Sequence, residues 1–364
     1  MPTAPWVTCE WGIYGASERR LATAMAGRPG MRTAVFGGGA WGTAIARHAA
    51  RQGDALLWLR DGEQCAQVAR SRENARYLPG VPLPDNLMLS ANLEQACLWL
   101  AQAPSLAILG VPMAGLRGLL GELAPRLPTA CAGVVWLCKG IDVQTGELAH
   151  QLARPFLGMF PGAALSGPGF AQEVAAGLPT ALTLASGNAA LVSATRQSLH
   201  HSGLRVYQSE DPIGVELGGA LKNVMAIAAG ISDGLELGMN ARAALMTRGL
   251  AEITRLGVAM GARAATFTGL TGLGDLVLTC TGALSRNRHV GLAMAQGLSL
   301  RQALGDLGHV AEGVACAPIA VSLARRYGVE MPILEAVVAV LEGRLVPREA
   351  VLGLLAREPR NEHD

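Results

Sequence analysis

Lys222 and Asn223 interrupt the apolar stretch 215–224, where residue types and spacing best support chemistry. At 3.6 residues per turn this stretch is apolar nearly all round, and Glu216 lies about 120° from Lys222 around the axis. Most lysines lie on a solvated helix face, but this helix offers none. A buried lysine loses solvation and its pKa falls, so Lys222 could act as an acid or base near neutral pH. Its ammonium would polarise a carbonyl oxygen and protonate the developing alkoxide, as interconversion of a ketone and an alcohol requires.

Two polar segments farther along the chain could serve the same site. The glycine-rich stretch 269–275 ends in Asp275, whose carboxylate could orient Lys222 and tune its charge, although capping of the segment 276–279 explains it equally well. Ser285, Arg286 and Asn287 offer a hydroxyl, a guanidinium fork and an amide, which suit a phosphate. A plain N-terminal cap for the following helix is the alternative.

The first half of the chain adds two candidate segments. Lys139 directly follows a predicted strand, at the carboxyl edge of the sheet where such folds bind ligands. The tight turn 166–170 contains Gly167 and Gly169 and could bring backbone N–H groups to a ligand, but by itself it indicates only a turn.

A dinucleotide-binding turn is predicted at 37–42, which matches G-x-G-x-x-G between a strand and a helix. Gly37 permits the tight turn, Gly39 lets the backbone approach a pyrophosphate, and Gly42 lets the helix pack on the strand. The helix N-terminus then presents free N–H groups to the phosphates. A glycine-rich turn without a ligand matches the same pattern, but the strand and helix on either side favour cofactor binding.

The end of the second predicted strand bears on which cofactor binds. An acidic residue at this place holds a ribose 2′-hydroxyl, whereas an arginine accepts a 2′-phosphate, and the chain has both Arg60 and Asp61. Because Arg60 is closer to the strand end, we expect NADP(H), with NAD(H) as the alternative. Two solvated loop charges are the other interpretation.

The predicted elements place these residues in an α/β fold. Apolar runs at 32–37, 55–59, 105–111 and 133–137 predict strands, and 41–52 predicts a helix, which together indicate a Rossmann-type, doubly wound parallel sheet. Beyond about 210 the periodicity is helical, at the stretches 212–231, 241–260, 288–296, 312–327, 333–342 and 347–357. We therefore expect an N-terminal extension at 1–30, a dinucleotide-binding domain at 31–210 and an all-helical substrate domain at 211–364.

Composition excludes several classes of protein. Half of the 364 residues are hydrophobic and only 16% are charged, which excludes a disordered chain, and a net charge of +2 implies no affinity for nucleic acid. The seven cysteines contain no CxxC pair, so we expect reduced thiols, a cytoplasmic protein and no metal site. No apolar run approaches 18 residues, so no membrane span is expected.

Taken together, these segments resemble the bacterial NAD(P)-dependent glycerol-3-phosphate dehydrogenase family from about residue 31 to about residue 345. The similar segments are GGGAWGTA at 37–44, CKGI at 138–141, LSGP at 165–168, EVAAGLPTA at 173–181, VELGGALKN at 215–223, GLGDLVLTC at 272–280 and LSRNR at 284–288. Several are long, and they follow the family's order and spacing.

The resemblance implies an activity and a set of roles. Dihydroxyacetone phosphate and sn-glycerol 3-phosphate would be interconverted by hydride transfer, for phospholipid synthesis, in a homodimer, with Lys222 as the acid/base residue. Lys139 would contact both cofactor and substrate. The other implied substrate contacts are Gly167, Asp275, Ser285, Arg286 and Asn287. The implied cofactor contacts are Ala40, Trp41, Arg60, Ala171, Arg286, Val310 and Glu312.

One position departs from the family pattern, and two rival functions remain. The family usually has Ser or Thr where this chain has Gly169, so only backbone would meet the substrate there.

A 3-hydroxyacyl or 2-hydroxyacid dehydrogenase would commonly use a catalytic histidine, yet His289 and His309 lie in polar or loop segments. A non-catalytic dinucleotide sensor would need the glycine turn but not Lys222, Asp275 and Arg286 together.

Overall fold

The computed structural model describes residues 31–307 and 311–358. The predicted extension at 1–30 and the predicted cofactor residue Val310 lie outside the described residues.

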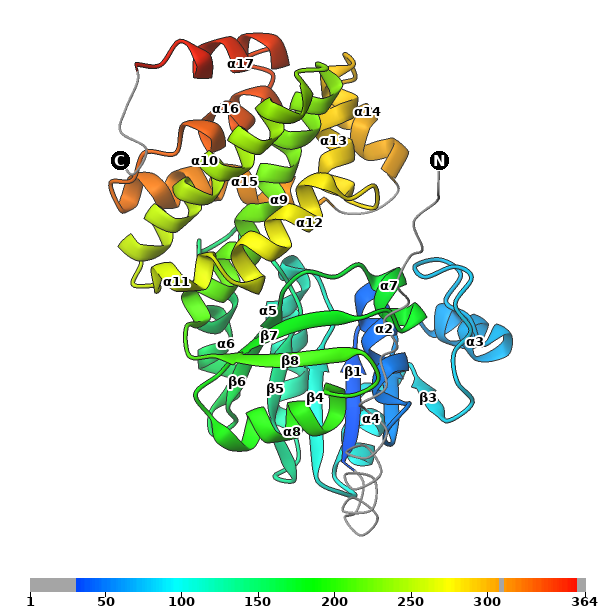
Figure 1. Ribbon diagram of the computed structural model, residues 1–364. Coiled ribbons are helices and arrows are strands. Elements are labelled where there is room, and N and C mark those ends of the chain that lie inside the picture. The colour runs from blue at the N-terminus through cyan, green and yellow to red at the C-terminus, as the bar shows by residue number, and fades with distance from the viewer. Residues whose placement is uncertain (1–30, 308–310, 359–364) are drawn as a thin grey trace, which may run out of the picture. The chain divides into compact units, whose positions relative to one another are not determined.

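An eight-stranded sheet forms the first half of the described chain, in the order β3-β2-β1-β4-β5-β6-β7-β8 (Figure 1). Its strands are β1 (Arg32–Phe36), β2 (Ala55–Trp58), β3 (Leu87–Ser90), β4 (Ser105–Leu109), β5 (Cys131–Trp136), β6 (Gly162–Ser166), β7 (Thr180–Ala185) and β8 (Leu204–Ser209). The predicted Rossmann-type α/β class is confirmed, with one difference from a fully parallel sheet. β7 runs antiparallel to β6, while β8 runs parallel to β7. The chain passes from β6 to β7 along one sheet edge through the short helix α7 (Ala171–Ala176), so β7 begins near the end of β6.

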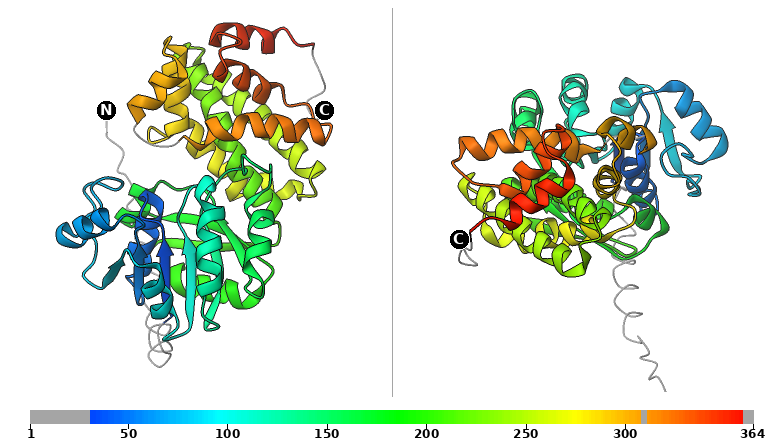
Figure 2. Two further views of the ribbon diagram at one scale, coloured as in Figure 1. Left: turned by 180° about the vertical axis from the view of Figure 1, so that it is seen from behind. Right: turned by 90° about the horizontal axis from the view of Figure 1, so that it is seen from above.

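Helices cover both faces of the sheet because the strands are apolar on both sides. The helices α2 (Ala40–Ala49) and α8 (Ala189–Leu199) contribute to the core on one face. The core on the other face includes residues of α4 (Leu93–Leu100), α5 (Met113–Leu123) and α6 (Ala149–Leu157), which Figure 2 shows from behind. The remaining helices of this half are α3 (Gly62–Ser71), which follows β2, and the short 3-10 helix η1 (Ala124–Arg126), which follows α5.

Strand register decides which residues meet at the carboxyl edge. Phe36 of β1 is paired with Leu109 of β4, which is paired with Trp136 of β5. The glycine turn after β1 and Lys139 after β5 therefore leave the sheet at the same edge, where ligands bind in such folds.

The second half of the described chain is helical and is built around α9 (Pro212–Gly234) (Figure 1). Around it lie α10 (Gly238–Ala259), α12 (Asp275–Thr281), α13 (Arg286–Ala295), α15 (Glu312–Arg326) and α16 (Pro332–Leu341). The short helix α11 (Ala264–Phe267), the π-helical turn η2 (Leu270–Gly274), α14 (Leu300–Leu307) and α17 (Pro347–Leu355) complete the half.

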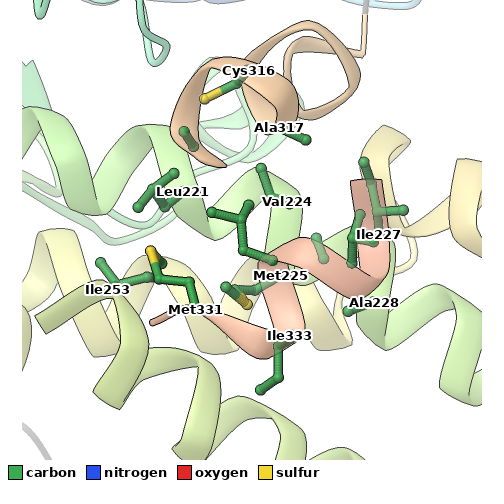
Figure 3. Close-up of a cluster of buried hydrophobic side chains, with 14 of the residues drawn as sticks. Leu221, Val224, Met225, Ile227, Ala228, Ile253, Cys316, Ala317, Met331 and Ile333 are labelled. Atoms are coloured by element: carbon green, nitrogen blue, oxygen red, sulfur yellow. The ribbon is translucent and has the colours of Figure 1, made fainter. Parts of the chain in front are cut away.

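Burial of α9 explains its composition. Every residue from Gly214 to Ser232 is buried, and Leu221, Val224 and Ile227 point into the apolar cluster that α10, α15 and α16 share (Figure 3). By length and hydropathy α9 passes the test for a membrane span, but 94% of its apolar window is buried inside the fold, as in the core helix of a soluble protein. Its apolar character therefore reflects packing against other helices.

Glycines let α13 approach α9 very closely. A Cβ on Gly291 of α13 would lie 2.0 Å from the carbonyl oxygen of Ile227, and a Cβ on Gly230 would lie 2.0 Å from that of Arg288. No larger residue fits at either position, so this crossing fixes the start of α13 relative to Lys222 on α9.

Candidate active site

Lys222 is buried near the middle of α9, with 7% of its surface exposed. Its Nζ donates hydrogen bonds to Asp275 Oδ1 at 2.5 Å and to Thr279 Oγ1 at 2.8 Å. The helix presents no solvated face at this position, as its apolar sequence predicted. Two of the three ammonium N–H donors are thereby used within the protein, which leaves one for a ligand.

Asp275 joins the two halves of the described chain. It is the first residue of α12, is 1% exposed, and accepts from Lys139 Nζ at 2.7 Å through Oδ2 and from Lys222 through Oδ1. The carboxylate does not act as a helix cap, which was the alternative role, because no side-chain capping hydrogen bond forms at the start of α12. The carboxylate instead fixes the separation of the two ammonium groups.

The two lysines at this carboxylate are the only lysines in the chain, whose other basic side chains are arginines and histidines. An arginine does not lose its proton in proteins, whereas a lysine does so readily once it is buried. The occurrence of lysine at only these two positions is a signal in the sequence that could have linked Lys139 to Lys222.

Burial and charge act together on Lys222. Burial lowers the pKa of the Lys222 ammonium, the charge of Asp275 raises it and the charge of Lys139 lowers it, and together they bring it to about 8. Two ammonium groups around one carboxylate leave a net positive site, which suits an anionic ligand or a developing alkoxide.

Lys139 and the turn after β6 meet beneath α9. Lys139 Nζ also donates to the carbonyl oxygen of Gly167 at 2.9 Å, and Gly167 has a φ of 132°, which favours glycine. Gly219 of α9 has no side chain that would collide with Ser166, since a Cβ there would lie 2.8 Å from Ser166 Oγ. That hydroxyl is buried and has no hydrogen-bond partner in the described part of the chain.

The residues of the segment 285–288 have different contacts. Ser285 caps α13 by accepting from Arg288 N at 3.3 Å, so the capping alternative describes its contact in the structure. Arg286 is exposed. Asn287 is buried, donates to Asn223 Oδ1 at 2.9 Å and accepts from Gly313 N at 3.1 Å. Arg286 is therefore the member of this segment whose guanidinium is available to a ligand.

Glu312, the first residue of α15, interacts with both Arg286 and the start of α5. Burial raises the pKa of the Glu312 carboxyl, while the charge of Arg286 and a hydrogen bond from the backbone of Met113 lower it. Since Met113 begins α5 directly after the carboxyl end of β4, this contact brings Glu312 and the sheet edge together.

The glycine turn has the geometry that a dinucleotide requires. Gly37 has a φ of 131°, and a Cβ on Gly42 would lie 2.0 Å from the Gly37 carbonyl oxygen. Gly39 precedes α2, and a Cβ there would meet only the Gly110 carbonyl oxygen, at 4.0 Å. The space beside Gly39 is thus open to a phosphate at the helix N-terminus, next to Ala40 and Trp41.

The two charges after β2 have different surroundings. Asp61 caps α3 by accepting from Glu63 N at 2.9 Å and Gln64 N at 3.2 Å. Arg60 is exposed and has no hydrogen bond or ion pair within the described ranges. The carboxylate is thus engaged by the helix, and the guanidinium is free to meet a ligand.

A small cavity lies between Trp41, a predicted cofactor residue, and Lys139, a predicted substrate residue. Its lining consists of Trp41, Ile45, Leu137, Lys139, Leu165, Ser166 and Leu182. Gly169 borders the Trp41 ring, where a Cβ would lie 3.1 Å from the ring, and Ala171 is buried at the start of α7. The departure from the family pattern therefore lies beside Trp41.

Thr279 and Asn223 belong to the site but were not assigned a role from the sequence. Thr279 accepts from Lys222 and lies four residues after Asp275 on the same helix, a spacing that could have indicated it. Asn223 Nδ2 donates to the Gly219 carbonyl at 3.3 Å and faces that of Lys139 at 3.5 Å, so it ties α9 to the strand-end lysine.

Comparison with known proteins identifies the family. The model of the NAD-dependent glycerol-3-phosphate dehydrogenase N-terminus matches residues 32–192, and that of its C-terminus matches residues 211–352. The chain belongs to the NAD-dependent glycerol-3-phosphate dehydrogenase family. The resemblance inferred from the sequence motifs is thereby confirmed.

Relatives within this family cover nearly the whole chain. Glycerol-3-phosphate dehydrogenase [NAD(P)+] of Methylibium petroleiphilum is 54% identical over 332 residues, which are 91% of this chain and 98% of the relative. The crystal structure of glycerol-3-phosphate dehydrogenase from Coxiella burnetii has a TM-score of 0.85 at 39% identity and covers 90% of this chain and 99% of its own. The yeast (Saccharomyces cerevisiae) enzyme has a TM-score of 0.75 at 25% identity, over 88% of this chain and 98% of its own.

A more distant structure bears on the rival functions. A D-mandelate dehydrogenase has a TM-score of 0.56 at 15% identity, which shows a shared fold and no more. The fold alone therefore does not separate the candidate activities, and the site residues have to do so.

Proposed function

We propose that this family member interconverts dihydroxyacetone phosphate and sn-glycerol 3-phosphate, with Lys222 as the acid/base residue. As a member of this family, the protein is an NAD(P)-dependent oxidoreductase that acts on a CH–OH group. The observation that carries the assignment of Lys222 is its buried contact with Asp275, which Lys139 shares. When bound, the cofactor accepts or supplies a hydride at C4 of its nicotinamide ring.

In the proposed mechanism Lys222 handles the proton on the substrate oxygen. With a pKa of about 8 it is mostly protonated at neutral pH, and its third N–H meets no acceptor among the described residues. During ketone reduction it polarises the C2 carbonyl and then gives its proton to the alkoxide oxygen. Asp275 and Thr279 hold the ammonium in place, and Lys139 adds positive charge.

The substrate phosphate is proposed to bind Arg286 directly. Arg286 is exposed at the start of α13 and forms the planar fork that phosphates accept. Asn287 is engaged with Asn223 and Gly313, so in this proposal it contributes only by exchanging one of those partners, while Ser285 holds the helix start. Gly167 and Gly169 would offer backbone groups only.

The cofactor is proposed to bind along the glycine turn, with the chain's preference set by Arg60. The open space beside Gly39 and the uncapped start of α2 fit a pyrophosphate, and Ala40 and Trp41 would line it. Because Asp61 is engaged as a helix cap and Arg60 is free, we favour NADP(H) over NAD(H). Lys139, Ala171, Arg286 and Glu312 would complete the nicotinamide end.

We also propose the cellular setting that the family resemblance implies. Residues 31–210 would bind the cofactor and 211–364 would complete the substrate site, in a cytoplasmic homodimer. The six cysteines within the described residues are all free thiols, which agrees with a reducing compartment. The product would serve glycerophospholipid synthesis.

An assay of substrate choice tests the proposed activity. Oxidation of NADPH and NADH is followed with dihydroxyacetone phosphate and, in parallel, with unphosphorylated dihydroxyacetone. We expect turnover with the phosphate ester and a loss of at least 100-fold in kcat/KM without the phosphate, because Arg286 would lose its partner. Equal rates with both ketones would exclude the proposed phosphate site, and no rate with either cofactor would exclude the activity.

A further inference from the structure

A buried asparagine outside the family motifs quoted above holds the glycine turn. Asn74 is 1% exposed and lies in the loop 72–86, between α3 and β3. Its Nδ2 donates to the Gly38 carbonyl oxygen at 2.8 Å and to Thr43 Oγ1 on α2 at 2.8 Å. Both N–H groups of this amide are therefore used, one by the glycine turn and one by the helix α2 that follows it.

The turn needs such a restraint because of its composition. Three successive glycines, 37–39, give the backbone more freedom than any other residues would, and the peptide between Gly38 and Gly39 has no side chain of its own to fix its plane. Gln64 Nε2 also approaches the Gly38 carbonyl, but at 3.5 Å, and it reaches Asn74 Oδ1 at 3.3 Å. Asn74 is thus the short, buried contact to this carbonyl.

The direction of one N–H group follows from this contact. In a trans peptide the carbonyl and the following N–H point in opposite directions, and no cis peptide occurs in the described chain. Since the Gly38 carbonyl points to Asn74, the Gly39 N–H points away from it. No acceptor for that N–H is present among the described residues, and the space beside Gly39 is open.

We propose that Asn74 is a positioning residue for cofactor binding, which aims the Gly39 N–H at the pyrophosphate by holding the Gly38 carbonyl. The inference rests on the proposed binding of a dinucleotide at the glycine turn. Asn74 does not touch the cofactor in this scheme. It removes the conformational freedom that the turn would otherwise lose on binding, so its effect belongs to cofactor affinity and not to the chemical step.

The loop offers a matched control. Arg72 anchors the same loop through the carbonyl oxygens of Pro84 and, at 3.0 Å, Leu87, without a contact to the glycine turn. Arg72→Leu therefore loosens the loop and leaves the Gly38 carbonyl contact intact. Asn74→Leu keeps a side chain of similar length but removes both N–H donors. Asn74→Asp keeps the shape of the amide, also without its N–H donors, and serves as a second variant should the first fail to fold.

The test measures cofactor dissociation constants and steady-state kinetics on the full chain. NADPH and NADH are titrated into each variant, and kcat and both KM values are then determined with dihydroxyacetone phosphate. We expect Asn74→Leu to raise the dissociation constant and KM of the tighter cofactor by about tenfold, because the buried hydrogen bond that holds the Gly38 carbonyl is lost. We expect kcat and the KM for the ketone to change by less than about threefold, with Arg72→Leu close to the parent.

Each other outcome has a defined meaning. An Asn74→Leu dissociation constant within twofold of the parent overturns the inference. So does an equal loss in Arg72→Leu, because order of the loop would then be sufficient. A parent protein that binds neither cofactor overturns the proposed function itself, and the two failures are therefore distinguishable.

Discussion

At the scale of single residues, the shared carboxylate of Asp275 controls the charge of both lysines. It contacts Lys139 at 2.7 Å and Lys222 at 2.5 Å in a buried site, so its loss would leave two ammonium groups facing one another. Removing one partner of a buried charge cluster leaves the others uncompensated, which costs more than a surface pair would.

The pKa of Lys222 can be measured directly because the chain has only two lysines. The NMR spectrum of protein labelled with ¹³C at lysine Cε should show two lysine signals, and the Lys139→Met variant shows which signal belongs to which lysine. We expect the Lys222 signal to titrate near pH 8, since burial lowers its pKa to about that value. A midpoint above 10 would contradict the buried, acid/base role.

Replacing Asp275 should move the same titration. Asp275→Asn removes the charge that raises the pKa of Lys222, so that pKa should fall. Ketone reduction needs the protonated lysine, so the fall in rate with rising pH should begin at a lower pH in the variant than in the parent. Near neutral pH, kcat should drop at least 100-fold. The measurement is the pH profile of kcat for reduction. Thr279→Val, which removes one neutral acceptor of Lys222, should shift the profile less.

Arg60 should determine the preference between the two cofactors. Arg60→Ala is expected to raise the KM for NADPH at least tenfold and to leave the KM for NADH within about threefold, because only NADPH has the 2′-phosphate. Asp61→Ala is the control, since it removes a helix cap and should cost about 1 kcal/mol of stability without a change in selectivity. Equal effects of Arg60→Ala on both cofactors would argue against the assignment.

At the scale of elements, the crossing of α9 and α13 links stability to the site. Gly291→Ala puts a Cβ 2.0 Å from the Ile227 carbonyl oxygen, so the helices must separate. We expect a loss of about 1–3 kcal/mol in the free energy of unfolding and a raised KM for the phosphate ester, because Arg286 begins α13.

A second helical glycine serves as the control for that prediction. Gly353 lies on exposed α17 with no atom within 4 Å of an added Cβ, so Gly353→Ala should stabilise by about 0.5–1 kcal/mol through helix propensity and leave the KM unchanged. Urea unfolding measures both variants. A stable Gly291→Ala with parental kinetics would show that the close crossing is not required.

At the scale of the whole molecule, one buried carboxyl should make stability depend on pH. Glu252 of α10 is 2% exposed and accepts from Ile333 N at 2.8 Å and Leu334 N at 3.3 Å, at the start of α16. Burial raises the pKa of Glu252 to about 7. Its folded-state pKa thus exceeds the unfolded value near 4.5, so its stabilising effect is complete below about pH 4.5 and is lost as pH rises through 7.

The variant Glu252→Gln removes this dependence. Urea unfolding of parent and variant between pH 5 and 8 should show the parent losing about 2–3 kcal/mol relative to the variant as pH rises. The comparison uses the difference between the two proteins, so other titrating groups cancel. A constant difference across this range would show that Glu252 does not titrate there.

Much of the fold could be predicted from the sequence, and the reasons for the gaps are physical. The strands β1, β2, β4 and β5 and six helices of the second half appear as apolar runs or periodic stretches at nearly the observed bounds. The strands β3, β6, β7 and β8 were not predicted. β6 is built mainly from small residues and β8 alternates as a half-exposed edge strand, so neither forms a continuous apolar run.

The site was less predictable than the fold because its contacts are distant in sequence. Lys139 and Asp275 are 136 positions apart, and only the packing of α9 on the sheet and the π-helical turn before α12 bring them together. Residue types could indicate Lys222, whose apolar helix has no solvated face. They could not show that Ser285 caps a helix while Arg286 stays free, since both functions use the same residue types.

The central claim is that Lys222 handles the substrate proton, and kcat for the reduction of dihydroxyacetone phosphate by Lys222→Ala tests it most directly. The parent and the variant are compared at pH 7 with saturating cofactor, after titration has shown that both bind it. We predict a loss of about 10²–10⁴-fold in kcat with cofactor affinity retained, as for removal of a general acid. A folded variant that binds cofactor and keeps kcat within tenfold of the parent would contradict the account.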